Sequence, residues 1–499
     1  MVRRAVVIAA ASGYLRIGVR FASIALLARL LTPAEIGIAV IGSGVMTVML
    51  GLREFASPEF LIQRHQVTRD DIRASFTVLF LITALMTVAA FVVAPWIGKF
   101  YGEPKLAPFL QISAIAGLIE ALSLPTVGLL RRDMAFGAVA CVNTTNAATL
   151  AIATAGFAVA GHGFMSYAWG AAAAAGATTL MAFCFRPDPS ILCPALRSWG
   201  KVLRFGGYNG ASAVINRIYE GLPQLFLGQV LSHSQIGMYD RANVASEVPD
   251  KIVLTSVFTV AFPALATHVR ENRCVKEPYL RALGLIAVVY WPAQVLLAIL
   301  AYPAVWFILG PQWLEDGVPL LQLIAIAGLA WFPVYMAPPV LLALGANRDR
   351  VLVDLIGRSV AAIGLCGAAF FGILAMAASK LVTMPFHMVL AFWFVRRHVP
   401  FRWSELGAAL GRSAIVTGAT ALGPLAVVAL SEEGFALSLS QTGVALALAA
   451  AGWLASVLLA QHPVLLELRR AFDESAELPA LRRLRERMVA PAPRAEEVR

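Results

Sequence analysis

Residues 26–37 read LLARLLTPAEIG, which predicts the end of one apolar helix, a short turn and the start of the next helix. Two hundred positions later, residues 226–237 read FLGQVLSHSQIG. The two stretches are identical at four positions: Leu27/Leu227, Leu31/Leu231, Ile36/Ile236 and Gly37/Gly237. Most of the remaining pairs are close substitutions, so the second stretch is a recognisable copy of the first.

A second pair of similar segments occurs at an offset of 211. Residues 107–118 read APFLQISAIAGL and residues 318–329 read VPLLQLIAIAGL, with eight of twelve positions identical. The shared Pro-x-x-Gln pattern and the aligned glycine argue against mere similarity of apolar composition. Because both pairs occur in the same order at nearly the same offset, we predict that the chain consists of two related halves.

The composition is that of a membrane protein. Of the 499 residues, 59% are hydrophobic and only 14% are charged, and the mean hydropathy is +0.75. Apolar runs of about 20 residues, the length that crosses a bilayer, recur along the chain, and we count about fourteen of them between residues 7 and 460. We therefore predict an all-α integral membrane protein. Arg16 and Arg20 interrupt the first run, which argues against a cleavable signal peptide.

The distribution of basic residues predicts the orientation in the membrane. Of the 40 Lys and Arg residues, 30 fall in alternate loops and in the tail, whereas the loops on the opposite side contain only Lys99 and Lys105. The positive-inside rule then places both termini, and the linker near Trp199, in the cytoplasm. The net charge of +11 is explained by this topology, because the basic residues lie in short loops, and no nucleic-acid partner is expected.

Charged residues inside apolar spans mark the candidate site, because a charge near the bilayer centre costs at least about 2.5–3.5 kcal/mol. Arg16 and Arg20 lie about 40° apart on one face of the first span. The seventh span has a corresponding polar face within an arc of about 100°. We predict that spans one and seven line a water-filled cleft between the halves. The candidate substrate-binding residues are Arg16, Arg20, Asn209, Asn216, Arg217, Glu220 and Gln224.

The eighth span has a second polar face, for which we predict a role in ion coupling or gating. Its residues are Asp240, Asn243, Glu247, Asp250 and Lys251, and this part of the span should face water or protein because lipid cannot solvate it. Pro249 is expected to bend the helix there. Arg241 is expected to extend from the outer end of the span to the membrane surface. Glu120 and Lys380 are isolated in the sequence, which indicates no partner for either.

The motifs of the common enzyme classes are absent from the sequence. It has no glycine-rich phosphate loop, no His-Glu-x-x-His and no Walker lysine, and its seven histidines are scattered. The five cysteines show no metal-ligand spacing. We therefore expect neither catalytic residues, nor a metal, nor a cofactor.

Six motifs together give the chain a family resemblance: residues 26–37; FLIQRHQVTRDD at 60–71; APWIGKFYGEPKL at 94–106; LRRDMAF at 130–136; residues 223–252; and VAFPALA at 260–266. In their order and spacing the chain resembles the Wzx-type polysaccharide flippases, especially the WzxC-like branch, of the multidrug/oligosaccharidyl-lipid/polysaccharide exporter superfamily. The resemblance covers residues 7–460. Arg53, Glu54 and Glu59, after the second span, are more charged than the family pattern.

The resemblance implies two six-helix bundles related by a pseudo-twofold axis, which form a V-shaped central cavity. On this basis we expect an N-terminal lobe at 1–190, a C-terminal lobe at 191–404, an extra pair of helices at 405–462 and a basic cytoplasmic tail at 463–499. Related flippases hold the diphosphate of their substrate with cavity arginines, a role that falls here to Arg16 and Arg20.

The resemblance also implies a function. We expect a non-enzymatic flippase of the bacterial inner membrane that moves a polyprenyl-diphosphate-linked oligosaccharide across the bilayer by alternating access, coupled to a Na⁺ or H⁺ gradient. Expected partners are the lipid-linked oligosaccharide, the bilayer and proteins of polysaccharide polymerisation or export. A multidrug extruder of the same fold and a polytopic glycan polymerase or ligase are the alternatives. Two central arginines disfavour cationic drugs, and short outer loops disfavour the polymerase.

Overall fold

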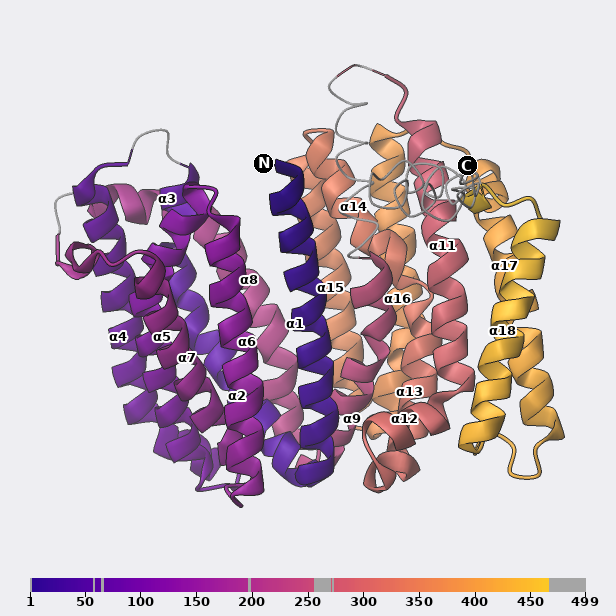
Figure 1. Ribbon diagram of the computed structural model, residues 1–499, viewed down its shortest axis with the longest axis horizontal. Helices are drawn as coiled ribbons and strands as arrows, with labels where there is room; N and C mark the ends of the chain where they lie inside the picture. The colour runs from indigo at the N-terminus through magenta and orange to yellow at the C-terminus, as the bar shows by residue number, and fades with distance from the viewer. Residues whose placement is uncertain are drawn as a thin grey trace, which may run out of the picture. The chain divides into compact units, whose positions relative to one another are not determined.

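The computed structural model describes residues 2–56, 59–63, 67–195, 199–254, 271 and 273–465, which form helices and connecting loops with no β-strand among them (Figure 1). Most of the predicted basic tail lies outside the described residues. The helices are α1 (Val2–Leu30), α2 (Pro33–Gly51), α3 (Glu59–Gln63), α4 (Arg69–Phe100), α5 (Leu106–Arg132), α6 (Phe136–Val159), α7 (Met165–Phe185), α8 (Trp199–Val230), α9 (His233–Ser246), α11 (Lys276–Ile299), α12 (Ala301–Ile308), α13 (Leu314–Gly328), α14 (Trp331–Ala343), α15 (Asn347–Ala369), α16 (Ile373–His398), α17 (Trp403–Leu430) and α18 (Leu439–Leu459). Short helical turns occur at η1 (Leu52–Ala56), η2 (Pro189–Leu192), η3 (Asp250–Leu254) and η4 (Pro311–Trp313).

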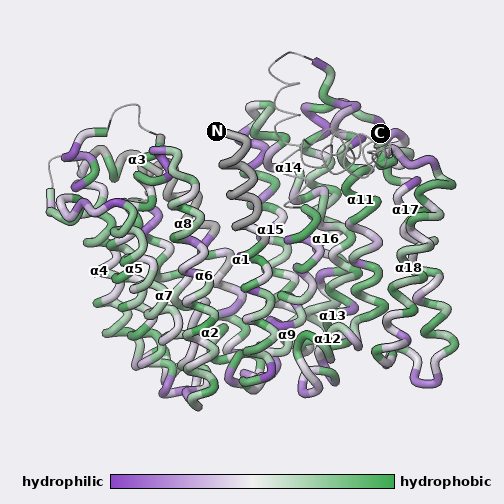
Figure 2. The backbone as a smooth tube through the Cα atoms, in the orientation of Figure 1, coloured by the Kyte–Doolittle hydropathy of each residue, from purple (hydrophilic) through white to green (hydrophobic). Residues whose placement is uncertain are grey.

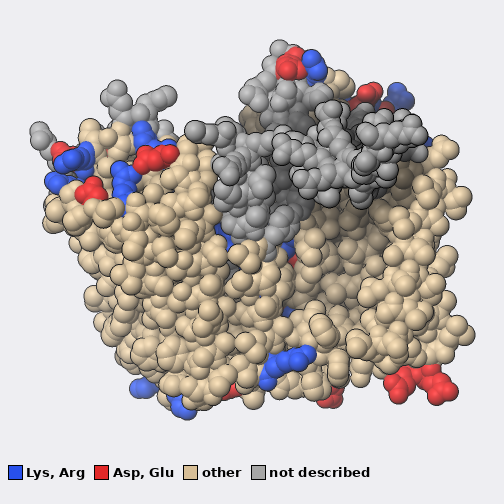
Figure 3. All heavy atoms as spheres, in the orientation of Figure 1, with Lys and Arg blue, Asp and Glu red and all other residues tan. Residues whose placement is uncertain are grey.

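Ten helices in the described part of the chain are long and apolar enough to cross a membrane. A bent pair, Pro311–Gly328 with Trp331–Ala343, passes the same test with a 43° break between its two parts. The middle portions of the helices are predominantly apolar (Figure 2), and most charged atoms on the visible face lie near helix ends (Figure 3). The prediction of an all-α multi-pass membrane protein is confirmed, while the count of fourteen spans stays a prediction.

The chain divides into two compact units by its internal contacts. The first contains Met1–Lys251, Ala301–Ala327 and Leu352–His387, and the second contains Ile252–Leu300, Gly328–Val351 and Met388–Arg499. In the first unit, α5 packs against α4 and α7, α6 against α7 and α1, and α2 against α8 and α9. In the second, α17 packs between α11 and α18. The candidate site lies entirely within the first unit.

The duplicated stretches adopt the same local structure. Thr32 caps α2: its hydroxyl accepts a hydrogen bond from the backbone N–H of Glu35, whose carboxylate accepts one from the N–H of Thr32. Ser232 and Gln235 form the same reciprocal pair at the start of α9. Such capping boxes satisfy backbone N–H groups that a helix start leaves unpaired. The polar pairs in the two copies therefore have the same structural role.

The two copies also contact each other symmetrically where α2 and α9 cross. A Cβ added to Gly37 would lie 1.7 Å from the carbonyl oxygen of His233, and one added to Gly237 would lie 2.0 Å from that of Pro33. Pro33 and His233 are themselves 200 positions apart, so each copy makes the same contact with the other. This reciprocity is the signature of a twofold relation. It also requires glycine at both positions, because any side chain would separate the helices.

The helical segment that begins with α9 is interrupted near Pro249, as predicted. α9 ends at Ser246, and the chain continues as a π-helical turn over Asp250–Leu254. Proline has no N–H to donate to the preceding turn, which explains a break here. Such π-helical turns are frequent at functional sites. The break lies among the polar residues Glu247, Asp250 and Lys251.

Candidate functional site

A cavity of about 440 Å³ lies between helices that are far apart in the sequence. Its lining residues belong to α1, α2, α6 and α7 and, later in the chain, to α8 and α9. Its polar and charged lining residues are Arg16, Arg20, Ser23, Ser43, Asn146, Thr154, Tyr167, Gln224, Asp240 and Arg241. The remaining lining residues are aliphatic. The cavity therefore offers hydrogen-bonding groups and positive charge inside an otherwise apolar bundle.

Arg16 and Arg20 are the exposed cations of this cavity. Both belong to α1, one helical turn apart, and both side chains are exposed. Within the described part of the chain, neither forms an ion pair within 4 Å, although Arg20 is within electrostatic range of Asp240. An arginine in a membrane cavity that is not neutralised by a carboxylate is available to an anionic ligand. The sequence predicts that Arg16 and Arg20 share one face of the first span. Their common position in the lining of this cavity is compatible with that prediction.

Arg241, which also lines the cavity, is held in place by two contacts. Its Nη2 donates to the hydroxyl of Tyr167 at 2.9 Å, and its Nε lies 3.7 Å from the carboxylate of Asp240. The residue is only 6% exposed. The expectation that Arg241 extends to the membrane surface was therefore wrong. The sequence shows only a position near a helix end, whereas the tyrosine from α7 and the neighbouring aspartate draw the guanidinium inward.

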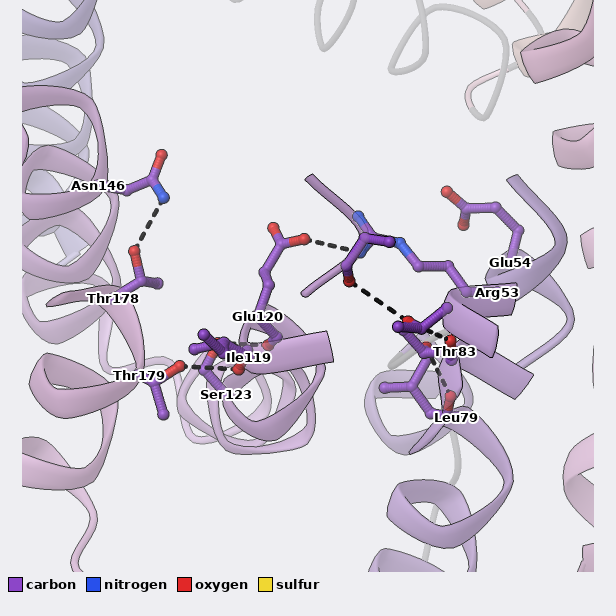
Figure 4. Close-up of polar contacts among 12 residues, drawn as sticks. Arg53, Glu54, Leu79, Thr83, Ile119, Glu120, Ser123, Asn146, Thr178 and Thr179 are labelled. Atoms are coloured by element: carbon purple, nitrogen blue, oxygen red, sulfur yellow. Dashed lines mark hydrogen bonds and ion pairs between the residues drawn. The ribbon is translucent and has the colours of Figure 1, made fainter. Parts of the chain in front are cut away.

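A second cavity of about 430 Å³ adjoins the first, since the two have lining residues in common. The shared residues are Ser43, Asn146, Leu150 and Tyr167. In the second cavity, Arg53 pairs with Glu120 at 2.7 Å (Figure 4), and Arg217 pairs with Glu54 at 3.3 Å. Each of its two arginines is thus matched by a carboxylate. The exposed, unpaired cations are concentrated in the first cavity.

The predicted substrate-binding residues fall into three groups. Arg16, Arg20 and Gln224 line the first cavity, and Arg217 lines the second. Gln224 also fills the space beside Gly44, where an added Cβ would lie 2.6 Å from its Oε1. Asn209, Asn216 and Glu220 belong to α8, but their side chains lie outside the described residues.

Of the predicted coupling or gating residues, Asp240 lines the first cavity. Asn243 and Lys251 each contact Glu247 instead. Asn243 Nδ2 donates to Glu247 Oε1 at 3.4 Å, and Lys251 Nζ lies 3.7 Å from Glu247 Oε2. Asp250 lies in the π-helical turn that follows. The described residues contain no group of three His, Cys, Asp or Glu side chains positioned to hold a metal ion.

Sequence reasoning missed two polar elements of the site. Glu120, for which it indicated no partner, is bound by Arg53 from a helical turn 67 positions earlier. Asn146 on α6 lines both cavities and donates to the hydroxyl of Thr178 at 2.8 Å (Figure 4). An acid inside an apolar span requires a partner, so Glu120 itself was a usable signal for the first contact. Asn146 gave no comparable signal, because a single amide in a span is compatible with many packings.

The fold and the cavity define a multi-pass α-helical membrane protein with a polar, arginine-containing interior. The chain belongs to the polysaccharide biosynthesis protein family, whose model matches residues 26–316. It is 22% identical over 321 residues to the lipopolysaccharide biosynthesis protein WzxC of Escherichia coli K12, a match that covers 63% of this chain and 64% of that protein. The chain thus matches less than two thirds of that relative's length. The predicted resemblance to WzxC-like proteins is confirmed.

Two further comparisons extend this result. The chain is 25% identical over 353 residues to the succinoglycan biosynthesis transport protein ExoT of Rhizobium meliloti, covering 70% of each protein. Its fold matches that of the lipid II flippase MurJ in an inward closed conformation, with a TM-score of 0.73 at 12% identity. That match covers 90% of this chain and 98% of the MurJ structure. At this identity the likeness shows a shared fold and leaves the substrate to be argued from the cavity.

Proposed function

We propose that this protein is a flippase that moves a polyprenyl-diphosphate-linked oligosaccharide across the bacterial inner membrane for surface or exopolysaccharide biosynthesis. It is a transporter and catalyses no covalent step. The observation that carries the proposal is the pair of exposed arginines, Arg16 and Arg20, in the lining of the first cavity. The names of the relatives, which concern lipopolysaccharide biosynthesis and succinoglycan transport, support the same substrate class.

The cavity lining suits the two chemically different parts of such a substrate. A diphosphate keeps its negative charge and cannot be moved into an apolar environment without replacement of its hydration. Guanidinium groups offer bidentate hydrogen bonds to phosphate oxygens and stay charged at all physiological pH values. Hydroxyl and amide groups, such as those of Asn146, Tyr167 and Gln224, are able to hydrogen-bond a glycan. The polyprenyl chain stays in lipid, where it is already solvated.

The proposed movement is alternating access, in which the lobes at 1–190 and 191–404 change their mutual arrangement around the bound diphosphate. The proposed extra helix pair at 405–462 and the tail at 463–499 are not part of these lobes. Asp240, Asn243, Glu247, Asp250 and Lys251 are the residues proposed to couple or gate this movement. In the proposed orientation both termini are cytoplasmic, and proteins of polymerisation or export receive the flipped product.

Reconstitution of the purified chain tests the proposal. Proteoliposomes are loaded with a fluorescent polyprenyl-diphosphate oligosaccharide, and the label reaching the opposite leaflet is measured by membrane-impermeant quenching. The proposal predicts faster translocation than in protein-free vesicles, and competition by an unlabelled diphosphate lipid. The same vesicles are assayed for efflux of a cationic drug. Drug efflux without glycan-lipid translocation would replace the proposal with the multidrug alternative.

A further inference from the structure

Lys380 lies on α16, within an apolar helix long enough to cross the membrane, and is half-buried. A lysine at such a position requires a partner, because its ammonium loses hydration that lipid cannot replace. Its Nζ donates a hydrogen bond to Oδ1 of Asn243 on α9. The same Nζ lies 5.2 Å from the centre of the Tyr239 ring, at the distance of a cation–π contact. The sequence, in which α9 and α16 are more than a hundred positions apart, indicated neither contact.

The groups around this ammonium continue into a small charged cluster. Asn243 uses its amide nitrogen to donate to Glu247 at 3.4 Å, so its oxygen is oriented toward Lys380. The charges of Glu247 and Asp250 both act on Lys380. Lys251 lies 3.7 Å from Glu247 on its other side. The two lysines and two carboxylates therefore neutralise one another, with the amide and the aromatic ring completing the surroundings of Lys380.

An amide oxygen, an aromatic face and nearby carboxylates all stabilise an ammonium ion: the amide oxygen accepts its hydrogen bond, and the ring and carboxylates attract its charge. Here they surround an ammonium that is covalently part of the chain. We propose that this cluster is a monovalent-cation site that the protein fills permanently with Lys380. The inference rests on the contacts of Lys380 alone and is independent of the substrate proposed above.

Two consequences follow from a tethered cation. A free Na⁺ ion does not bind at Asn243 and Glu247 in the natural protein, because the ammonium already occupies that place. Removal of the lysine leaves one uncompensated negative charge in the membrane interior together with the space of three methylenes and an amine. A propylammonium ion has the atoms that a Lys380→Ala substitution removes, and is the ligand that the emptied site should accept.

The test measures the unfolding midpoint of the full-length, detergent-purified chain at constant ionic strength. Lys380→Ala should lower the midpoint by about 5 °C, the scale expected when a half-buried cluster loses the charge that balances its carboxylates. Propylammonium chloride should recover most of this loss, whereas the bulky N-methyl-D-glucamine cation should not. The matched control is Lys105→Ala, at an exposed lysine before α5. In this control and in wild type, the two cations should have the same effect on the unfolding midpoint.

A second variant keeps the proposal falsifiable should Lys380→Ala not fold. In Lys380→Ala with Glu247→Gln the cluster is again neutral, so folding should be recovered without amine and the response to propylammonium should disappear. Three results would overturn the proposal: a Lys380→Ala protein as stable as wild type; equal stabilisation by both cations; or a wild-type protein stabilised selectively by Na⁺, with that effect lost in Asn243→Ala.

Discussion

At the residue scale, the site is defined by which charges are paired. Arg53, Arg217 and Arg241 each contact a carboxylate, at 2.7, 3.3 and 3.7 Å respectively. Arg16 and Arg20 do not do so within the described part of the chain. Because all five arginines line two adjoining cavities, this difference decides which of them an incoming anion meets as free positive charge.

The Arg53–Glu120 pair predicts a compensating charge reversal. Arg53→Glu alone places two carboxylates together and should lower the free energy of unfolding by about 1 kcal/mol or more, since the pair is only partly buried. Adding Glu120→Arg should recover most of that loss. The measurement is thermal unfolding of the two single variants and the double variant. Strictly additive losses would contradict a direct interaction.

The sequence supports a site prediction where the signal is local. Arg16 and Arg20 share a helix face by spacing alone, and their placement in a cavity follows from the cost of charge in lipid. It failed where the partner is distant. Nothing near Arg241 in the sequence identifies Tyr167, and nothing near Lys380 identifies Asn243. Tertiary contacts between helices decide such pairings, and the periodicity of one helix does not contain them.

At the scale of elements, the crossing of α2 and α9 is the most constrained contact of the duplicated segments. A Cβ at Gly37 or Gly237 would overlap a backbone carbonyl of the other helix. A backbone atom cannot rotate away as a side chain does, so the helices would have to separate. The repeat in the sequence predicted two related segments. It did not predict that the two segments contact each other, because duplication alone does not indicate where the symmetry axis that relates them lies.

Gly37→Ala and Gly237→Ala should each destabilise the protein by about 3 kcal/mol or more, at the upper end of overpacking effects. Gly156→Ala on α6 is the matched control, because no atom lies within 4 Å of its added Cβ. That substitution should be neutral or slightly stabilising, as alanine favours helix over glycine. Folded yield and unfolding midpoint are the readouts. Tolerance of alanine at Gly37 would contradict the close crossing.

At the scale of the whole molecule, the apolar helices were predictable because an apolar stretch of about 20 residues is long enough to cross a bilayer. The family was predictable from motif order. The number of spans is harder to predict, since α1 and α8 are 29 and 32 residues long but carry charged or polar side chains within their length. Such helices depend on a polar cavity rather than on lipid. The mean hydropathy of a segment therefore does not show whether such a helix crosses the membrane.

The orientation in the membrane makes a prediction for the entire chain. Reporter fusions at Lys201 should indicate the cytoplasm and fusions at Glu432 the opposite side, because 30 of the 40 basic residues would then lie inside. A phosphatase that is active only outside and a fluorescent protein that folds only inside provide complementary signals. The reverse pattern would contradict the proposed direction of transport, which moves substrate from the basic side.

The central claim is that Arg16 and Arg20 bind the diphosphate of the substrate. Its most direct test is the glycan-lipid translocation rate of Arg16→Ala with Arg20→Ala in proteoliposomes at matched protein content. The control is Lys99→Ala with Lys105→Ala, which removes the same charge from exposed positions. With about 1.5–3 kcal/mol for each charged hydrogen-bonding group, the rate should fall about 100-fold or more. The control should stay near wild type. A folded double-arginine variant that translocates at the wild-type rate would contradict the claim.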